Sequence, residues 1–344
     1  MDLTLSFPGL LDTARDPGEP ARAPILASML AAARAVRQES EGRIAALAPR
    51  FGVSRTGDWP LAALALVAAG HDPAGRYWLR ATPVSLEAGR DDVRLVAAVR
   101  DLVQHECDAL LALLNTHFSA DGLVFVAIQP WDWLVGAASA PALVTHDLAT
   151  ALGHRLRPYL PSGGDAALWS RWEQEIEMLL HEHPVNVARE SAARLPVNAV
   201  WFQHGGHHPR ATTVPGLRVW GDDPDVLALA AHAQASVVAD LPASLAAILA
   251  ATRHADHIVA PARALPLATI EHDFAVPAAR ALARGSLDQV TILADGAGTP
   301  AVAWTLAATP WWRRIGDSIT GLLADRGGGS LADVAARALA GTQR

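Results

Sequence analysis

A short run of histidines and glycines, from His204 to His208, holds the residue types best suited to chemistry. Gly205 and Gly206 let the backbone approach a ligand closely and offer free amide groups to an anion. The imidazoles of His204 and His207 add hydrogen-bond donors or metal ligands, although the adjacent His207 and His208 cannot both easily face one ion. A histidine-rich surface turn is the alternative interpretation. We expect a ligand-binding site at this run.

The segments before this run predict how it is positioned. Residues 198–202 form an apolar stretch that favours a buried strand. In open parallel sheets, ligands bind beyond the carboxyl ends of the strands, which is where the histidines would lie. A helix is predicted over residues 185–194, with Asn186, Arg189 and Glu190 in its first turns. Pro184 separates this helix from the preceding one.

The preceding helix carries a second set of reactive side chains. Glu173, Glu177 and His181 recur every four residues, beside an apolar stripe that runs from Trp169 to Leu180. Such a line suits a general acid–base pair or a set of metal ligands. A solvated helix face explains the same pattern, and we favour that interpretation.

A third set consists of weak metal-ligand candidates further along the chain. Asp222 and Asp223 follow a predicted strand, and Asp256 and His257 come after His254. A turn built around aspartate and proline explains the first pair equally well. A two-metal phosphoryl-transfer site needs about six or seven carboxylate and histidine ligands. A divalent metal is therefore not favoured as a cofactor.

Composition excludes several function classes. All 28 basic residues are arginines, so a phosphate-binding loop lysine and a Schiff-base lysine are both absent. The net charge of −7 comes without a basic run, which argues against nucleic acid as a partner. No apolar window reaches the roughly 18 residues of a membrane span, and the first residues lack a basic leader. The single Cys107 suits a reducing compartment, so we expect a cytoplasmic protein.

Predicted strands alternate with predicted helices along most of the chain, which indicates an α/β fold with a largely parallel sheet. A helix is predicted over residues 24–47. A strand–helix–strand block at residues 76–160 predicts a smaller α+β lobe set into a larger core formed by residues 1–75 and 161–325. Residues 326–344 predict a peripheral C-terminal helix after a glycine-rich hinge.

The segments around the histidine run resemble known proteins. From Trp172 onward, the succession HPVN, ARE, PVN, W and GG resembles the RpfE-type regulatory family. Residues 198–209, NAVWFQHGGHHP, are also similar to a segment of archaeal-type cofactor-independent phosphoglycerate mutases. Residues 77–86, YWLRATPVSL, are similar to the inserted lobe of those mutases, where an arginine at the position of Arg80 helps to hold the phosphate.

The resemblance implies an alkaline-phosphatase-like, three-layer core with a mostly parallel sheet and a smaller inserted α+β lobe. It also implies a cradle for a small anionic ligand, phosphorylated or carboxylated. The residues of the expected ligand site are Arg80, Asn186, Arg189, Glu190, Asn198, Trp201, His204, Gly205, Gly206 and His207.

The catalytic parts of the mutases have no clear counterpart. Residues 5–11, LSFPGLL, stand where the mutases have a strand followed by a metal-binding aspartate, and the next carboxylate is Asp12. No segment resembles the one that carries the family's nucleophilic serine. We therefore expect an inactive or weakly active relative of the mutases.

Three functions follow from this comparison. The first is a mutase-like protein with a degenerate site that binds a small anion in a regulatory role. The second is an active metal-dependent phosphomutase or phosphatase with a rearranged site. The third is a protein-interaction module with a vestigial pocket, whose partner surface would be the tryptophans of residues 130–133 or 311–314.

Overall fold

The computed structural model describes residues 1–15, 23–38, 42–89, 92–241, 244–251, 255–308 and 330–340. The chain forms two compact units. The first unit combines Met1–Leu47 with Thr212–Arg344, and the second unit is Ala48–Ala211. The second unit is wider than the expected lobe of residues 76–160, because it also takes in segments on both sides of that block. Each unit is built on one sheet.

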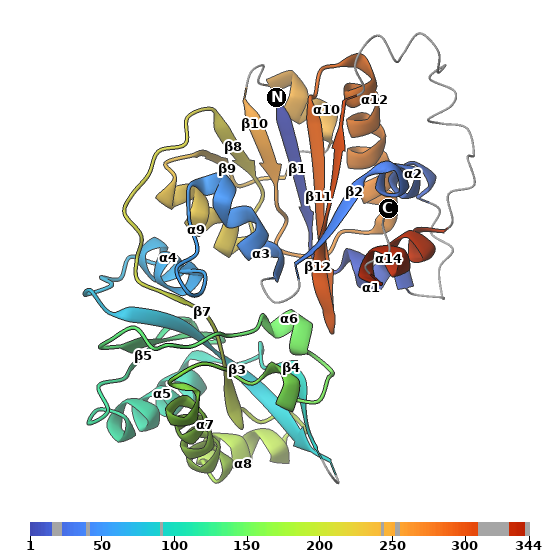
Figure 1. Cartoon of the computed structure of the whole chain (residues 1–344). Helices are drawn as coiled ribbons and strands as arrows, with labels where there is room; N and C mark the ends of the chain where they lie inside the picture. Colours follow the sequence, from blue (N-terminus) through green and yellow to red (C-terminus); the bar gives the residue numbers. More distant parts are fainter. Residues whose placement is uncertain are drawn as a thin grey trace. The chain divides into compact units, whose positions relative to one another are not determined.

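The first unit contains a seven-stranded mixed sheet with the order β2-β12-β11-β1-β10-β8-β9 (Figure 1). Neighbouring strands pair in parallel from β9 to β11, and β12 pairs antiparallel with both β11 and β2. The strands are β1 (Asp2–Phe7), β2 (Arg34–Gln38), β8 (Leu217–Trp220), β9 (Ser236–Val238), β10 (Asp256–Val259), β11 (Gln289–Gly296) and β12 (Thr299–Ala307). An α/β unit with a mostly parallel sheet is therefore present, as predicted.

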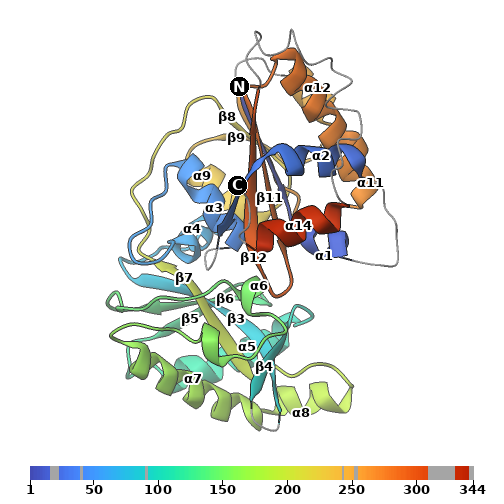
Figure 2. The same cartoon turned by 45° about the vertical axis from the view of Figure 1, so that its right-hand side comes forward.

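Helices cover both faces of this sheet (Figure 2). On one face lie α1 (Leu10–Arg15), α2 (Pro24–Ala32), the consecutive α11 (Leu267–Thr269), η3 (Ile270–Ala275) and α12 (Val276–Arg284), and α14 (Leu331–Leu339); α10 (Leu245–Ala251) contacts η3 and α12. On the other face lie α3 (Gly42–Leu47) and α9 (Pro224–His232). Side chains alternate along β1, so Leu3, Leu5 and Phe7 join the main apolar core, while Ser6 faces α3.

The predicted helix over residues 24–47 is interrupted by a strand. Its first part is α2 and its last part is α3, while the middle forms β2 at the edge of the sheet. The register pairs Val36 with Ala303 and Ala35 with Trp304 of β12. Sheet pairing with a distant segment therefore overrides the local helical spacing here. The expected C-terminal helix is α14, and Leu331, Val334, Ala335 and Ala338 are buried in the core rather than peripheral.

The second unit contains a five-stranded antiparallel sheet with a long central strand. The strand β3 (Tyr77–Ala88) pairs with β7 (Ala199–Gly206) on one side, and with β6 (Asp132–Ala137) and β4 (Val93–Ala98) on the other. The strand β5 (Val124–Gln129) pairs with β6. The predicted strand over residues 198–202 is thus present as β7, but its partner is antiparallel. The rule for the carboxyl ends of parallel strands does not apply to it.

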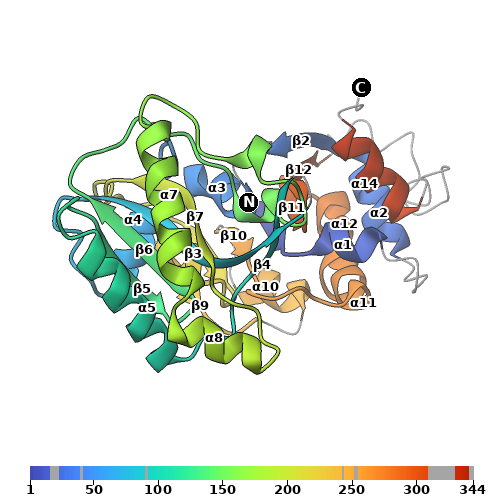
Figure 3. The same ribbon diagram turned by 90° about the horizontal axis from the view of Figure 1, so that it is seen from below.

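Helices pack on the antiparallel sheet through large apolar side chains. The helices α5 (Gln104–His117), α7 (Ala166–His181) and α8 (Pro184–Ser191) lie together on one side of it, as the view from below shows (Figure 3). Trp169 packs edge-to-face against Phe202 of β7 in this core. Shorter elements complete the unit, namely η1 (Ala48–Phe51), α4 (Leu61–Ala68), α6 (Leu148–Ala151) and η2 (Arg157–Tyr159). Among the described helices, none has the length and apolar character needed to cross a bilayer.

Candidate functional site

The carboxyl ends of the parallel strands bring three polar side chains of the first unit onto one arginine. Asp223 follows β8, Asp295 lies near the end of β11, and Ser6 lies near the end of β1. Arg43 of α3 contacts all three. Its NH2 group lies 3.0 Å from Oδ2 of Asp223, its Nε lies 3.1 Å from Oδ2 of Asp295, and its NH1 donates to Oγ of Ser6. We call these four residues the Arg43 cluster.

Local geometry fixes the two carboxylates of the Arg43 cluster. Gly221 precedes Asp223 at φ +126°, and a Cβ there would lie 2.2 Å from the carbonyl oxygen of Ala260, so the turn after β8 requires glycine. Oδ1 of Asp223 accepts the amide hydrogens of Asp225 and Val226 and thereby caps α9. Oδ1 of Asp295 accepts the amide hydrogen of Gly9. In each carboxylate, only Oδ2 remains for Arg43.

The Arg43 cluster is largely shielded from water, since the side chains of Arg43 and Asp223 are each 7% exposed. Burial alone would lower the pKa of Arg43, but the carboxylates of Asp295 and Asp223 outweigh it and raise the pKa. The guanidinium therefore stays charged and supplies one positive charge to the two carboxylates at this edge of the sheet. Of these residues, the sequence singled out only Asp223. A signal for Asp295 existed, because an Asp-Gly pair follows the apolar run of β11.

The four weak metal candidates do not gather at this edge. Asp222 and Asp223 follow the end of β8, whereas Asp256 begins β10 opposite Leu217, at the start of β8. The two pairs are therefore more than about 10 Å apart along the strand direction. The carboxylate of Asp256 accepts the amide hydrogen of Asp2, and Nδ1 of His257 accepts from the indole of Trp220. His254 lies outside the described residues.

The donor set at the strand ends fits a guanidinium better than a metal ion. Both available carboxylate oxygens point at Arg43, and the hydroxyl of Ser6 accepts from the same group. Asp12, the first carboxylate after β1, accepts the amide hydrogen of Ala297 with both oxygens and is exposed. Across the described ranges, no three His, Cys, Asp or Glu side chains gather to hold a metal ion. The described residues at this edge therefore suit an ion pair with Arg43 better than the two-metal site considered above.

The first residues of the histidine run, His204 to Gly206, belong to β7 and form a bulge in it, while His207 and His208 follow the strand. The register between β3 and β7 shifts between Trp78 and Arg80, and His204 adopts φ +58° at this point. Left-handed backbone is uncommon for histidine and costs about 1 kcal/mol. Thr145 and Asp58 hold the bulge, because Oγ1 of Thr145 accepts the amide of His204 and Oδ2 of Asp58 accepts the amide of Gly205. Oγ1 of Thr145 also donates to Asp58.

The imidazole of His204 is buried between carboxylates. Its Nε2 lies 3.4 Å from Oδ2 of Asp147, and the charge of Asp58 also acts on it. Burial alone would lower the pKa of His204, but Asp147 and Asp58 outweigh both burial and the opposing charge of Arg80, so the pKa is raised. The sequence analysis did not identify Asp58, Thr145 and Asp147 as neighbours of His204, because they lie far from it in the sequence.

The two glycines of the run are required by packing. A Cβ on Gly205 would lie 2.5 Å from the hydroxyl of Tyr77, and a Cβ on Gly206 would lie 2.5 Å from Cβ of Pro60. Both residues are buried in β7. His207 is exposed, and its Nδ1 lies 3.1 Å from the carbonyl oxygen of Arg76. The glycines thus serve close packing, and their buried amides do not form the open anion cradle that we expected.

The two arginines of the expected cradle are both held by acidic residues. Nε of Arg80 lies 3.0 Å from Oδ1 of Asp132. Arg189 is fully buried, and its guanidinium contacts Asp101 and Glu106 while its Nε donates to the carbonyl oxygen of Leu195. The structure therefore gives no support to a cradle in which Arg80, Arg189 and His204 face one anion.

The asparagines of the HPVN and PVN segments act as clamps on the backbone. Asn186 donates to the carbonyl oxygens of Leu180 and Val197 and accepts the amide hydrogen of Val197, which joins the end of α7 to the segment before β7. Asn198 makes the corresponding pair of bonds with the backbone of Leu86. These contacts give the motif a structural reason that is independent of any ligand.

The remaining candidates also have structural surroundings. The indole of Trp201 is buried and donates to the carbonyl oxygen of His146, while Glu190 is exposed. Within the expected tryptophan surface, Trp131 is 36% exposed and Trp133 is fully buried. Residues 311–314 lie outside the described residues.

Comparison with known proteins shows a distant relationship. No protein-family model matches the chain. The sequence is 25% identical over 165 residues to the 2,3-bisphosphoglycerate-independent phosphoglycerate mutase of Methanosarcina mazei, a match that covers 42% of this chain and 41% of that protein. The same enzyme of Methanosarcina acetivorans is 25% identical over 170 residues, covering 43% and 42%. The matched segment thus spans less than half the length of these relatives.

Two solved structures align with most of the chain at low similarity. The cofactor-independent phosphoglycerate mutase from Thermoplasma acidophilum gives a TM-score of 0.36 at 15% identity, over 89% of each chain. The PH0037 protein from Pyrococcus horikoshii gives 0.44 at 13% identity, over 89% of this chain and 87% of that one. By sequence, the chain is a distant relative of the archaeal-type cofactor-independent mutases. The closer resemblance to the RpfE-type family stays a prediction.

Proposed function

We propose that this chain is a phosphoglycerate-mutase-like protein that does not carry out metal-dependent phosphoryl transfer and serves as a binding or regulatory protein. The observation that carries the proposal is the position of Arg43, whose guanidinium bridges Asp223 and Asp295. In α/β proteins, the carboxyl ends of the parallel strands are where ligands bind. Here a fixed cation of the protein lies between the two carboxylates of that edge.

Charge and donor geometry support this proposal. A divalent ion at this edge would compete with Arg43 for Oδ2 of both carboxylates, because Oδ1 of Asp223 accepts two backbone amides and Oδ1 of Asp295 accepts one. The displaced guanidinium would then be a buried charge without a partner, which costs several kcal/mol. An intact ion pair is therefore the more stable arrangement, and it leaves the edge without a metal-activated nucleophile.

A small anion, such as a phosphorylated or carboxylated metabolite, is the partner class suggested by the distant relatives. It would compete with Asp132 for Arg80, and with Asp101 and Glu106 for Arg189. The support for anion binding is consequently weaker than the support for the loss of catalysis. An active phosphomutase or phosphatase is the function to be tested against it.

Turnover measurements test the proposal. The purified full-length chain would be assayed with 3-phosphoglycerate and with p-nitrophenyl phosphate, in the presence of Mn²⁺ or Zn²⁺ and in the presence of a chelator. We expect the same rate with metal and with chelator. Metal-dependent turnover that falls at least about tenfold in Asp223→Asn would overturn the proposal, and Asp225→Asn, which changes an acidic residue outside the Arg43 cluster, is the matched control.

A further inference from the structure

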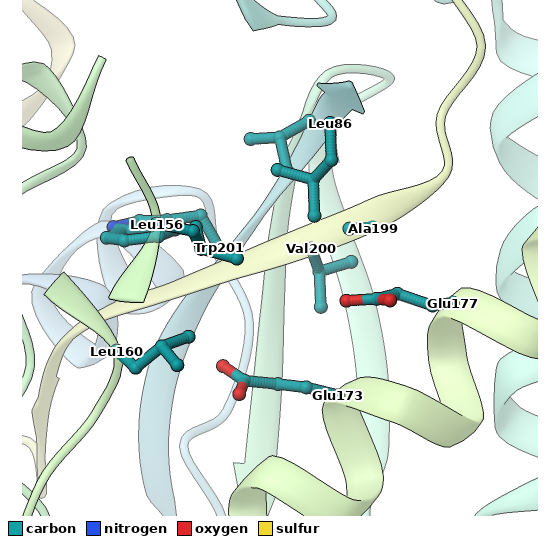
Figure 4. Close-up of a pocket in the computed structure, with 9 residues that line it drawn as sticks. Leu86, Leu156, Leu160, Glu173, Glu177, Ala199, Val200 and Trp201 are labelled. Carbon is teal, nitrogen blue, oxygen red and sulfur yellow. The ribbon is translucent and has the colours of Figure 1, made fainter. Parts of the chain in front are cut away.

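A small pocket, partly open to solvent, lies in the second unit between α7 and β7 (Figure 4). Aliphatic side chains such as Leu86, Leu156 and Leu160 form much of its wall, together with Trp201. The enclosed space is small, so a ligand held there would remain partly exposed to solvent. Glu173 and Glu177, which the sequence offered as an acid–base pair or metal ligands, line it, and Trp201 is its one residue from the expected ligand set.

Two carboxyl groups line this pocket from one helix, and of these residues Glu173 is partly buried while Glu177 is exposed. Glu173 and Glu177 are one turn apart on α7, so their side chains lie on the same face, and Figure 4 shows both directed at the space beside Val200 and Trp201. Within the described part of the chain, neither carboxyl makes an ion pair or a hydrogen bond. Glu175, on another face of α7, pairs instead with Arg171 and His117.

The absence of an internal counter-charge makes this pair costly to ionise. Burial, and then the charge of Glu177, raises the pKa of Glu173 to about 8, and burial also raises the pKa of Glu177. At neutral pH the pocket therefore keeps a proton on Glu173. A cation seated between the two carboxyls would replace that proton and remove the repulsion.

We propose that this pocket binds a small organic cation, a primary ammonium or guanidinium group on a short apolar body, between Glu173 and Glu177. The two carboxylates would hold the charged head by charge-assisted hydrogen bonds. The indole of Trp201 is fixed by its bond to the carbonyl oxygen of His146, and with the leucines it would contact the apolar body. A bare metal ion fits poorly, because two carboxyls on apolar walls offer too few ligands.

Calorimetric titration with benzylamine tests this site, with benzyl alcohol as the uncharged probe of similar shape. We expect benzylamine to bind the wild-type chain at pH 8, with an affinity at least about tenfold lower in Glu173→Gln and in Glu177→Gln. Glu175→Gln is the matched control on the same helix and should bind like the wild type. Binding should also release protons at pH 7, visible as a dependence of the heat on the buffer.

Several results would overturn the proposal. These are no binding of benzylamine to the wild-type chain, equal affinity for benzyl alcohol, or unchanged affinity in both glutamine variants. Thermal melting of each variant shows whether it folds, and we expect Glu173→Gln to melt no lower than the wild type because it removes the buried acid. The site is independent of the Arg43 cluster, so failure here leaves the proposed loss of catalysis untouched.

Discussion

Arg189 is a fully buried cation whose partners come from a different helix and the loop before it. Its NH1 group lies 2.8 Å from Glu106, its NH2 group binds Asp101, and Arg194 contacts the same two carboxylates. Replacing Arg189 with methionine keeps much of its bulk but leaves Glu106 with less counter-charge. We expect a loss of about 3 kcal/mol in the free energy of unfolding, measured by urea denaturation. Arg171→Met, at an exposed arginine of α7, is the control and should change it by less than about 1 kcal/mol.

Acid should reduce the difference in stability between the wild type and Arg189→Met. Burial raises the pKa of Asp101 and of Glu106, but bonds from Arg189 and Arg194, with a backbone amide for Glu106, outweigh it and lower both pKa values. A carboxyl group whose pKa is lower in the folded state stabilises the fold at pH values above its unfolded pKa of about 4. This stabilisation is lost as the pH falls through the folded-state pKa. The gap between wild type and Arg189→Met should therefore shrink below about pH 4. A gap that is constant from pH 7 to pH 3 would contradict this interpretation.

Gly206 tests whether the glycine pair of the histidine run serves packing. A Cβ at this position would lie 2.5 Å from Cβ and 2.7 Å from Cα of Pro60, and that backbone cannot move aside cheaply. We expect Gly206→Ala to lower the free energy of unfolding by about 1–3 kcal/mol. Gly164→Ala would add a methyl group at an ordinary 3.6 Å from Cβ of Ala142 and should have little effect. Equal unfolding midpoints for the two variants would refute the packing explanation.

At the scale of elements, the bulge in β7 makes the stability of the fold depend on pH through His204. Asp147, Asp58 and Arg80 face this imidazole, and the net result is a raised pKa. A histidine whose pKa is higher in the folded state stabilises the fold fully at pH values below its unfolded pKa of about 6.5. This stabilisation is lost as the pH rises through the folded-state pKa.

The variant His204→Asn keeps a residue that tolerates positive φ but removes the titrating group. The melting temperature of the wild type relative to His204→Asn should therefore be higher at pH 6 than at pH 9, by about 3 °C. The measurement is thermal unfolding across that range, and parallel pH profiles of the two proteins would disprove the role of the imidazole.

The helix α2 receives its N-terminal cap from a distant element. Ala23 offers no side-chain cap, and the two carboxylate oxygens of Glu271 in η3 accept the amide hydrogens of Ile25 and Leu26 at 2.9 Å. Since Glu271 is buried, Glu271→Ala leaves two helix donors without partners. We expect a loss of about 1–2 kcal/mol in the free energy of unfolding. Asp273→Ala in the same turn is the control, and an equal loss there would argue against capping.

Elements with local signals were predictable from the sequence. A strand was predicted before Asp222, and β8 lies there, because LRVW is a short apolar run between turn residues. The strand β2 was not, since it forms by pairing with β12. The strand β7 was found, but its antiparallel pairing with β3 was not, because a buried strand reads alike in either kind of sheet. The histidine run was consequently interpreted as a ligand-binding site.

At the scale of the whole molecule, the distant relationship to phosphoglycerate mutases was predictable and the content of the strand-end site was not. The partners of Arg43 lie 180 and 252 residues away in the sequence, at Asp223 and Asp295. Only the assembled sheet brings them together. The missing aspartate after β1 was visible in the sequence, whereas the arginine that bridges the two carboxylates of the same edge required the structure.

Stability measurements on Arg43→Ala, with and without Mn²⁺, test the central claim most directly. If Arg43 occupies the place of a cation, the variant leaves the buried Asp223 and the partly buried Asp295 without this counter-charge and should lose about 3–5 kcal/mol in the free energy of unfolding. Added Mn²⁺ should restore part of this loss in Arg43→Ala, while leaving the wild type and the exposed control Arg284→Ala unchanged. Stoichiometric Mn²⁺ binding to the wild type, or an Arg43→Ala variant as stable as the wild type, would contradict the claim.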